Sequence, residues 1–211
     1  MIEKYYNGVI EQVAGGIGNV EHNSILVRYS NDFSIWDLES VNHYKDQTDI
    51  FFTCHEFSYN KIAEAYEPYL GLIRQMFHKY CSGTLEEFME ECDVYKLQRP
   101  VFESYFEKGF CERTEQILID EVEYEQERMR NSIVTMLQKL SEIRPVVIVL
   151  NRFQLASKST MQLSNSLLQV KNKNIGIVLG VNDVQSIPEF AHEEWDAICE
   201  SMDDRNMVYH I

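Results

Sequence analysis

Two polar residues that could bind an anion follow directly on an apolar run of the chain. Asn151 and Arg152 come after the five apolar residues 146–150. Such a run is typical of a strand buried on both faces, as in a parallel sheet with helices on each side. Ligands bind outside the carboxyl ends of these strands. With Ser30 and Asn182, the pair could therefore hold an anion or a nucleotide, and Arg152 is the best candidate because a guanidinium can bind phosphate through two hydrogen bonds.

Cysteine and histidine residues suggest two other kinds of site. Cys54, His55 and Glu56 could supply metal ligands, but adjacent residues at a strand end point in different directions, so we expect no metal site. An unrelated small α/β enzyme would need Cys54 or Cys111 as a nucleophile and a histidine as a base. The other histidines of the chain are His22, His43, His78, His192 and His210. No G-x-S-x-G elbow or similar nucleophile motif occurs, which leaves this enzyme as a third interpretation.

The composition is that of a globular domain in a reducing compartment. The 211 residues can bury a full core, and 45% hydrophobic and 25% charged residues are ordinary values. A net charge of −15 opposes binding to nucleic acid and to anionic membranes, because both are bound through Lys and Arg. The sequence has no transmembrane run or signal peptide, and its five cysteines are most simply free thiols. We expect a cytoplasmic protein.

Strands and helices alternate along the chain and would position these residues. Strands are expected at 24–29, 49–54, 146–150, 175–181 and 206–211. Helices are expected at 3–13, 35–41, 59–80 (with a break or restart at Pro68) and 115–142, from Ser157 or Ser159 to Val170, and from Pro188 to about Met202. Residues 82–110 form a helical insertion, with a capping box at Thr84 and Glu87 and a helix stop at Gly109. Together these elements predict an α/β fold with a five-stranded, mostly parallel sheet between two helical layers.

A glycine-rich stretch at 14–18 has the composition of a phosphate loop but not its position. Phosphate loops follow a strand and open a helix, whereas this stretch precedes the strand at 24–29. We interpret it as a flexible approach to that strand.

The order of the elements resembles the P-loop NTPases of the AAA+ and STAND type, which bacteria place before signalling or transcription-factor output domains. Residues 54–56 and 65–70 are similar to the polar turn and helix start after the family's second strand. Residues 146–156, followed by Ser159 and Thr160, are similar to the Walker B strand, and residues 175–182 to the sensor-1 strand. The resemblance implies a single three-layer P-loop NTPase-like domain, 1–211, excised from a longer protein.

The residues that align with the phosphate loop lack its chemistry. The motif G-x-x-x-x-G-K-[ST] wraps phosphates with backbone N–H groups, a lysine and a hydroxyl on Mg²⁺. Here Tyr29 and Ser34 occupy the glycine positions, and Ile35 and Trp36 replace the lysine and the hydroxyl. Asp32 adds a negative charge where phosphate would lie.

The Walker B positions are also changed, since Asn151 and Arg152 replace its two acidic residues. Mg²⁺ prefers carboxylate and phosphate oxygens, and a neighbouring guanidinium repels it. Losing a single transition-state stabiliser typically costs about a hundredfold in rate. Arg152 could instead pair with Asp32 or Asp37 and fill the space of the lost phosphate and metal. The degenerate nucleotide-site positions are Ser30, Asn31, Asp32, Ser34, Ile35, Trp36, Asn151, Arg152 and Asn182.

These departures predict a pseudo-ATPase: a regulatory or protein-interaction module with no catalytic residue, no cofactor and no bound metal. Its partners would be other domains of the same chain or another protein, and the resemblance implies an output domain such as a diguanylate cyclase or a transcriptional regulator. The alternative is a sensor that binds a nucleotide or an anion without hydrolysing it. We interpret the acidic stretches at 86–93 and 120–127 as solvated surface rather than as docking sites for a basic partner.

Overall fold

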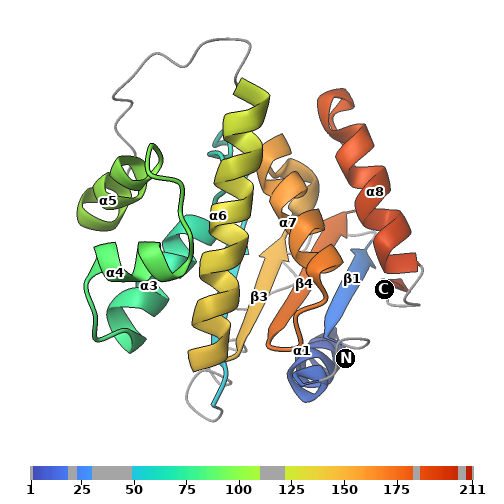
Figure 1. Ribbon diagram of the computed structural model, residues 1–211. Helices are drawn as coiled ribbons and strands as arrows, with labels where there is room; N and C mark the ends of the chain where they lie inside the picture. Colours follow the sequence, from blue (N-terminus) through green and yellow to red (C-terminus); the bar gives the residue numbers. More distant parts are fainter. Residues whose placement is uncertain are drawn as a thin grey trace. The chain divides into compact units, whose positions relative to one another are not determined.

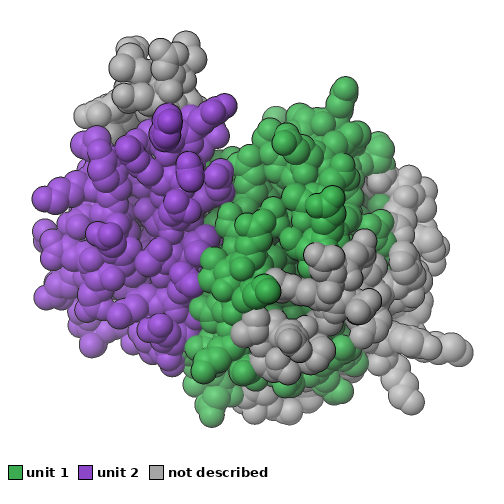
Figure 2. All heavy atoms as spheres, turned by 45° about the vertical axis from the view of Figure 1, so that its right-hand side comes forward, with its two compact units in different colours: residues 1–67, 144–211 green, residues 68–143 purple. Residues whose placement is uncertain are grey.

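The computed structural model describes residues 2–18, 23–29, 49–109, 122–182, 186–203 and 208–210. The chain divides into two compact units, one made of Met1–Glu67 and Arg144–Ile211 and the other of Pro68–Ile143 (Figure 2). The sheet belongs to the first unit, and the helices predicted within 82–110 belong to the second.

The first unit is built on a parallel β-sheet (Figure 1). Four strands of six to eight residues lie in the order β2-β3-β4-β1, and the short β5 pairs with the other side of β1. All four pairings are parallel. The strands are β1 (Ser24–Tyr29), β2 (Phe51–Glu56), β3 (Val146–Asn151), β4 (Ile175–Asn182) and β5 (Val208–His210). The predicted α/β class with a parallel sheet flanked by helices is confirmed.

Burial on both faces explains why the apolar runs form the inner strands. Every residue of β3 and of β4 is buried, as expected for inner strands of a parallel sheet covered by helices. The edge strand β2 is only partly buried. It begins and ends two residues later than predicted, so residues 54–56, expected as a polar turn, are its last three residues.

The strand order reverses next to β1, and this sets where a ligand site is expected. From β1 the chain crosses to β2 at the far edge of the sheet. From β4, the strand beside β1, it crosses in the opposite direction, past β1, to β5. In open parallel sheets the ligand crevice lies outside the carboxyl ends of the strands at such a switch point. Tyr29 and Asn182, which end β1 and β4, face each other there in the strand register.

Helices α7 (Lys158–Val170) and α8 (His192–Asp203) pack against each other over one face of the sheet (Figure 1). α7 has the predicted serine cap, because the Ser157 hydroxyl accepts the Thr160 N–H at 3.2 Å. The helix predicted from Pro188 starts later. Pro188 is followed first by a 3₁₀ turn, η3 (Glu189–Ala191), in which Phe190 is exposed.

Helix α1 (Ile2–Gly16) lies near the amino-terminal ends of β1 and β4 (Figure 1). Its buried face carries Val9, Ile10 and Val13, as predicted. The helix continues to Gly16, so the flexible approach expected at 14–18 is wrong for its first three residues. Val13 packs closely on β4, since a Cβ added to Gly176 would lie 2.7 Å from Val13 Cγ1.

The helices described in the second unit are α3, α4, α5 and α6. They span Tyr69–Tyr80, Leu85–Glu91, Arg99–Lys108 and Val122–Ile143. The predicted capping box is present, because Thr84 Oγ1 accepts the Glu87 N–H at 3.2 Å and Glu87 Oε2 accepts the Thr84 N–H at 2.9 Å. Gly109 ends α5 with a φ of 81°, a left-handed conformation that suits glycine.

Of the helix predicted over 59–80, with a break or restart at Pro68, only the part after Pro68 forms, as α3 from Tyr69. Residues 57–67 of the first unit are irregular. Their carbonyl groups bond to the start of α7 instead of to a helical turn. The Ser157 hydroxyl donates to the Glu64 carbonyl at 3.2 Å, and the Thr160 hydroxyl donates to the Glu67 carbonyl at 3.0 Å. This segment, which we call the β2 loop, is therefore held in place by the segment that follows β3.

Three predicted elements fall wholly or partly outside the described residues, and one of them is the strand expected at 206–211, of which only Val208–His210 is described. The helix expected at 35–41 is another, and the first part of the helix expected over 115–142 is the third; α6 covers the remainder.

Candidate functional site

Polar side chains meet at the carboxyl ends of β1 and β3. Asn151 is fully buried, and its Oδ1 accepts two hydrogen bonds, from the Tyr29 hydroxyl at 3.1 Å and from the Arg152 N–H at 2.9 Å. The Tyr29 side chain is buried as well, at 4% exposure. The side-chain acceptor of Asn151 is thus used twice within the protein. We call Tyr29, Asn151, Arg152 and their partner Glu56 the strand-end network.

The amide nitrogen of Asn151 lacks a hydrogen bond. Its Nδ2 is buried and has no hydrogen-bond partner in the structure as described. A buried donor left in this state costs about 1–3 kcal/mol, so such a group points to a bound acceptor or to a functional role. The Asn151 Nδ2 is therefore a buried donor that a bound acceptor could satisfy.

Arg152 has an uncommon backbone conformation. Its φ of 52° and ψ of 43° lie in the left-handed region, which non-glycine residues rarely adopt. Two contacts hold the side chain: its Nε lies 3.4 Å from Glu56 Oε1, and its guanidinium lies over the Tyr59 ring, 5.7 Å from the ring centroid. The guanidinium is therefore occupied by an acid and an aromatic ring from the end of β2 and the β2 loop.

Burial controls the ionisation of Tyr29. It raises the pKa of the phenol to about 12, and the nearby Arg152 charge opposes this only in part. The hydroxyl therefore remains protonated at physiological pH and acts as a permanent donor to Asn151.

A second buried amide connects β3 to β4. Gln154 lies in the 3₁₀ turn η2 (Phe153–Leu155) and is fully buried. Its Oε1 accepts the backbone N–H of Asn182 at 3.3 Å. The ends of β1, β3 and β4 are thus joined by strand pairing and by amide side chains.

Burial shifts the pKa values of one histidine and two cysteines in the described part of the chain. His55 Nε2 lies 3.9 Å from Glu67 Oε1, and burial lowers the pKa of this imidazole. Burial raises the pKa of the Cys92 thiol to about 12 and also raises that of Cys81, which makes both poor nucleophiles. Cys111, His22 and His43 lie outside the described residues.

No group of three or more His, Cys, Asp or Glu side chains that could hold a metal ion occurs within the described ranges. Among these residues, the carboxylate of the strand-end network is Glu56, and it faces the Arg152 guanidinium.

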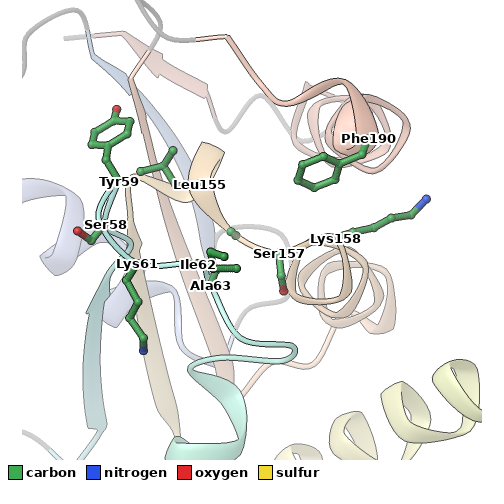
Figure 3. Close-up of a pocket in the computed structure, with 10 residues that line it drawn as sticks. Ser58, Tyr59, Lys61, Ile62, Ala63, Leu155, Ser157, Lys158 and Phe190 are labelled. Atoms are coloured by element: carbon green, nitrogen blue, oxygen red, sulfur yellow. The ribbon is translucent and has the colours of Figure 1, made fainter.

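The first unit has an open groove of about 290 Å³, whose lining residues Figure 3 shows. Tyr59, which stacks on Arg152, belongs to its lining. The β2 loop, the segment from Leu155 to Lys158 and Phe190 of η3 form the groove, all within the first unit.

The structure brings some of the predicted site residues together. Asn151 and Arg152 share the strand-end network, and Asn182 lies beside Tyr29 in the strand register. The remaining predicted positions lie outside the described residues: Ser30, Asn31, Asp32, Ser34, Ile35 and Trp36. Asp37, proposed with Asp32 as a partner of Arg152, also lies outside them.

The sequence interpretation considered Glu56 only as a metal ligand or part of a polar turn, and Tyr29 only as a residue at a glycine position of the phosphate loop. It did not assign Tyr59 or Gln154 to the site. Ligands bind outside the carboxyl ends of parallel strands, and this rule could also have identified Tyr29 and Glu56. They end β1 and β2 as Asn151 ends β3. No pattern in the sequence identifies Tyr59, whereas Gln154 lies within the Walker B-like stretch 146–156.

Fold and site together define an α/β protein with a parallel sheet and a buried polar cluster at its switch point. Comparison with protein-family models, with curated proteins and with solved structures found no match to this chain. None of the described helices is both long enough and apolar enough to cross a membrane.

Proposed function

We propose that this chain is a non-catalytic regulatory or protein-interaction module, a pseudo-ATPase derived from the P-loop NTPases of the AAA+ and STAND type. It would act on an output domain, such as a diguanylate cyclase or a transcriptional regulator, from a neighbouring position in a longer cytoplasmic protein. The alternating strands and helices and the Walker B-like sequence of β3 support the family, and the strand-end network supports the loss of catalysis.

The observation that carries this proposal is the double use of Asn151 Oδ1. At the Walker B position, Mg²⁺ chemistry needs an anionic oxygen free to bind the ion. Here the oxygen belongs to a neutral amide and already accepts hydrogen bonds from Tyr29 and Arg152. The next position carries a guanidinium, paired with Glu56. The network thus joins the strand ends through contacts among the chain's own side chains.

Nucleotide turnover and thermal stability test this proposal together. We expect no phosphate release from ATP above a protein-free control and no change in melting temperature with Mg²⁺-ATP. A ligand present at a hundred times its Kd would add about 2.7 kcal/mol, which corresponds to roughly 5–10 °C for a chain of this length. A rise of that size accompanied by phosphate release would refute the pseudo-ATPase.

A second candidate function, a sensor that binds a nucleotide or an anion without hydrolysis, is favoured by the unpartnered Nδ2 of Asn151. Isothermal titration with ATP, GDP and cyclic dinucleotides, with and without Mg²⁺, tests it. Micromolar binding that is lost in Arg152→Ala and in Asn151→Leu would support the sensor. Absence of heat for every ligand would contradict it and leave the purely interaction-based function.

A further inference from the structure

His55, near the end of β2, is a partly buried imidazole packed against residues of the β2 loop. Its side chain is 24% exposed, and its ring meets the Phe57 ring edge to face, with the ring centroids 4.6 Å apart. Glu67, the last residue of the β2 loop, places its Oε1 3.9 Å from His55 Nε2. In the strand register His55 lies beside Leu150 of β3, which is apolar. A positive charge on this imidazole would therefore be partly removed from water, and Glu67 is placed to balance it.

The Glu67 carboxylate, however, already serves the β2 loop itself. Lys61 Nζ donates to its Oε1 at 3.1 Å and to its Oε2 at 3.4 Å, and the Glu64 N–H donates to its Oε2 at 3.3 Å. Burial alone would raise the pKa of Glu67, but the bonds from Lys61 and Glu64 lower it, so the group stays ionised in mild acid. The negative charge nearest to His55 is thus largely neutralised by the Lys61 ammonium.

The other charges around His55 do not reverse the effect of its burial. Burial lowers the pKa of His55 below the ordinary histidine value of 6.5, and the Lys61 charge acts in the same direction. Glu67 and Glu56 act in the opposite direction without outweighing burial. Glu56 is itself paired with Arg152, at 3.4 Å. The closed loop therefore favours a neutral imidazole, whereas opening of the loop would let water reach it and a proton bind.

The β2 loop is built so that it can open without the sheet. Its conformation is irregular, and the Ser157 and Thr160 hydroxyls hold two of its carbonyls at 3.2 and 3.0 Å. Tyr66 within the loop has a φ of 60°, a left-handed conformation that non-glycine residues rarely adopt. Segments of this kind open locally at a smaller free-energy cost than core strands such as β3, which is buried throughout.

We propose that the β2 loop is an acid-sensitive latch, in which protonation of His55 releases the loop from the segment that follows β3. Tyr59 of this loop lies against the Arg152 guanidinium, 5.7 Å from ring centroid to Cζ, so release also removes the ring from Arg152. The inference goes beyond the proposed function, and it does not depend on whether ATP is bound or hydrolysed.

Hydrogen exchange of residues 57–67 at pH 7.5 and 5.5 tests this proposal, with mass spectrometry as the readout and correction for the intrinsic exchange rate at each pH. In the open loop His55 should titrate at about 6.5, whereas in the closed loop it stays neutral. The open population should therefore rise by up to about tenfold between the two pH values. Residues 146–151 of β3 should remain protected. No increase in residues 57–67, or an equal increase in residues 146–151, would overturn the proposal.

Two substitutions separate the charge of His55 from a merely structural role. His55→Gln should exchange equally at both pH values. Lys61→Gln weakens the loop at both, but it frees Glu67 to balance the imidazolium, so the rise in acid should shrink to about threefold or less. His192→Gln is the matched control, because His192 is an exposed histidine of the same unit, and it should keep the full rise. A full rise in Lys61→Gln would contradict the electrostatic coupling.

An NMR titration of His55 in the unchanged protein keeps the proposal testable even if a variant fails to fold. We expect its pKa below 6.5, and a higher value in Lys61→Gln. The sign of the shift decides the outcome. A pKa at or above 6.5 would mean that protonation holds the loop closed or leaves it unaffected, and it would overturn the proposal.

Discussion

Replacing Tyr29 by Phe should make the protein less stable near neutral pH and more stable than the unchanged protein at strongly alkaline pH. At roughly pH 8 the variant loses one buried hydrogen bond, to Asn151 Oδ1, and should be less stable by about 1 kcal/mol. Burial holds the pKa of the Tyr29 phenol near 12 in the folded protein, against 10.0 when unperturbed. Since the folded state favours the protonated form, this stabilisation is complete below pH 10 and is lost as the pH rises toward 12.

The size of this loss follows from the pKa. Each pKa unit is worth about 1.4 kcal/mol, so ionisation of Tyr29 should remove roughly 2–3 kcal/mol by the end of that range. Phe has no proton to lose, so the variant lacks this contribution. The two curves of unfolding free energy against pH should therefore cross between pH 10 and 12, with Tyr29→Phe the more stable form at the alkaline end.

Urea unfolding followed by circular dichroism, repeated across the alkaline range, measures both curves. Tyr124→Phe is the control, because Tyr124 is 66% exposed and its loss should leave the alkaline slope unchanged. If Tyr29→Phe and the unchanged protein lose the same free energy between pH 10 and 12, the Tyr29 hydroxyl is not desolvated and the strand-end network is wrongly described.

Three further measurements test other parts of the fold. His55→Gln should make the protein less sensitive to acid below about pH 6.5, because burial lowers the pKa of His55 and the unchanged protein loses that stabilisation as the imidazole is protonated; equal acid unfolding curves would contradict this. Gly176→Ala should destabilise by about 1–3 kcal/mol in urea, since its Cβ would lie 2.7 Å from a Val13 methyl carbon, whereas Gly15→Ala in the open part of α1 should be neutral or stabilising by up to about 1 kcal/mol. Cys92 should resist iodoacetamide in the folded protein, as detected by mass spectrometry, because burial raises its pKa to about 12; rapid modification under native conditions would show that it is accessible.

The sequence was informative where burial on both faces leaves a continuous apolar run. β3 and β4 are such strands, and their polar ends could be predicted as the site because parallel strands place their carboxyl ends at one edge. Asn151 and Arg152 were found in this way. The serine cap of α7 and the capping box of α4 were predictable for a similar reason, since they depend on residues three positions apart.

The features that sequence patterns did not predict depend on residues distant in the chain. The β2 loop has apolar and helix-compatible residues, but its carbonyls bond to Ser157 and Thr160, each 93 positions further on. The pairing of Arg152 with Glu56 is likewise a contact between two strand ends. Local propensity carries no information about such partners. The first part of the helix expected over 59–80 was therefore wrong, and the pairing of Glu56 with Arg152 was not predicted.

The strand order also has a consequence for how the chain is made. β1 lies inside the sheet, yet both of its neighbours, β4 and β5, come near the end of the sequence. Asn23, just before β1, donates to the Ile175 carbonyl across 152 residues. At the usual rate of synthesis, about 5–20 residues per second, the ribosome needs roughly 8–30 s to produce the partners of β1. During that interval an apolar strand has no sheet to join. We therefore expect co-translational folding to depend on chaperone protection of the first strand, while the helices of the second unit, whose contacts are nearer in sequence, can fold on emergence.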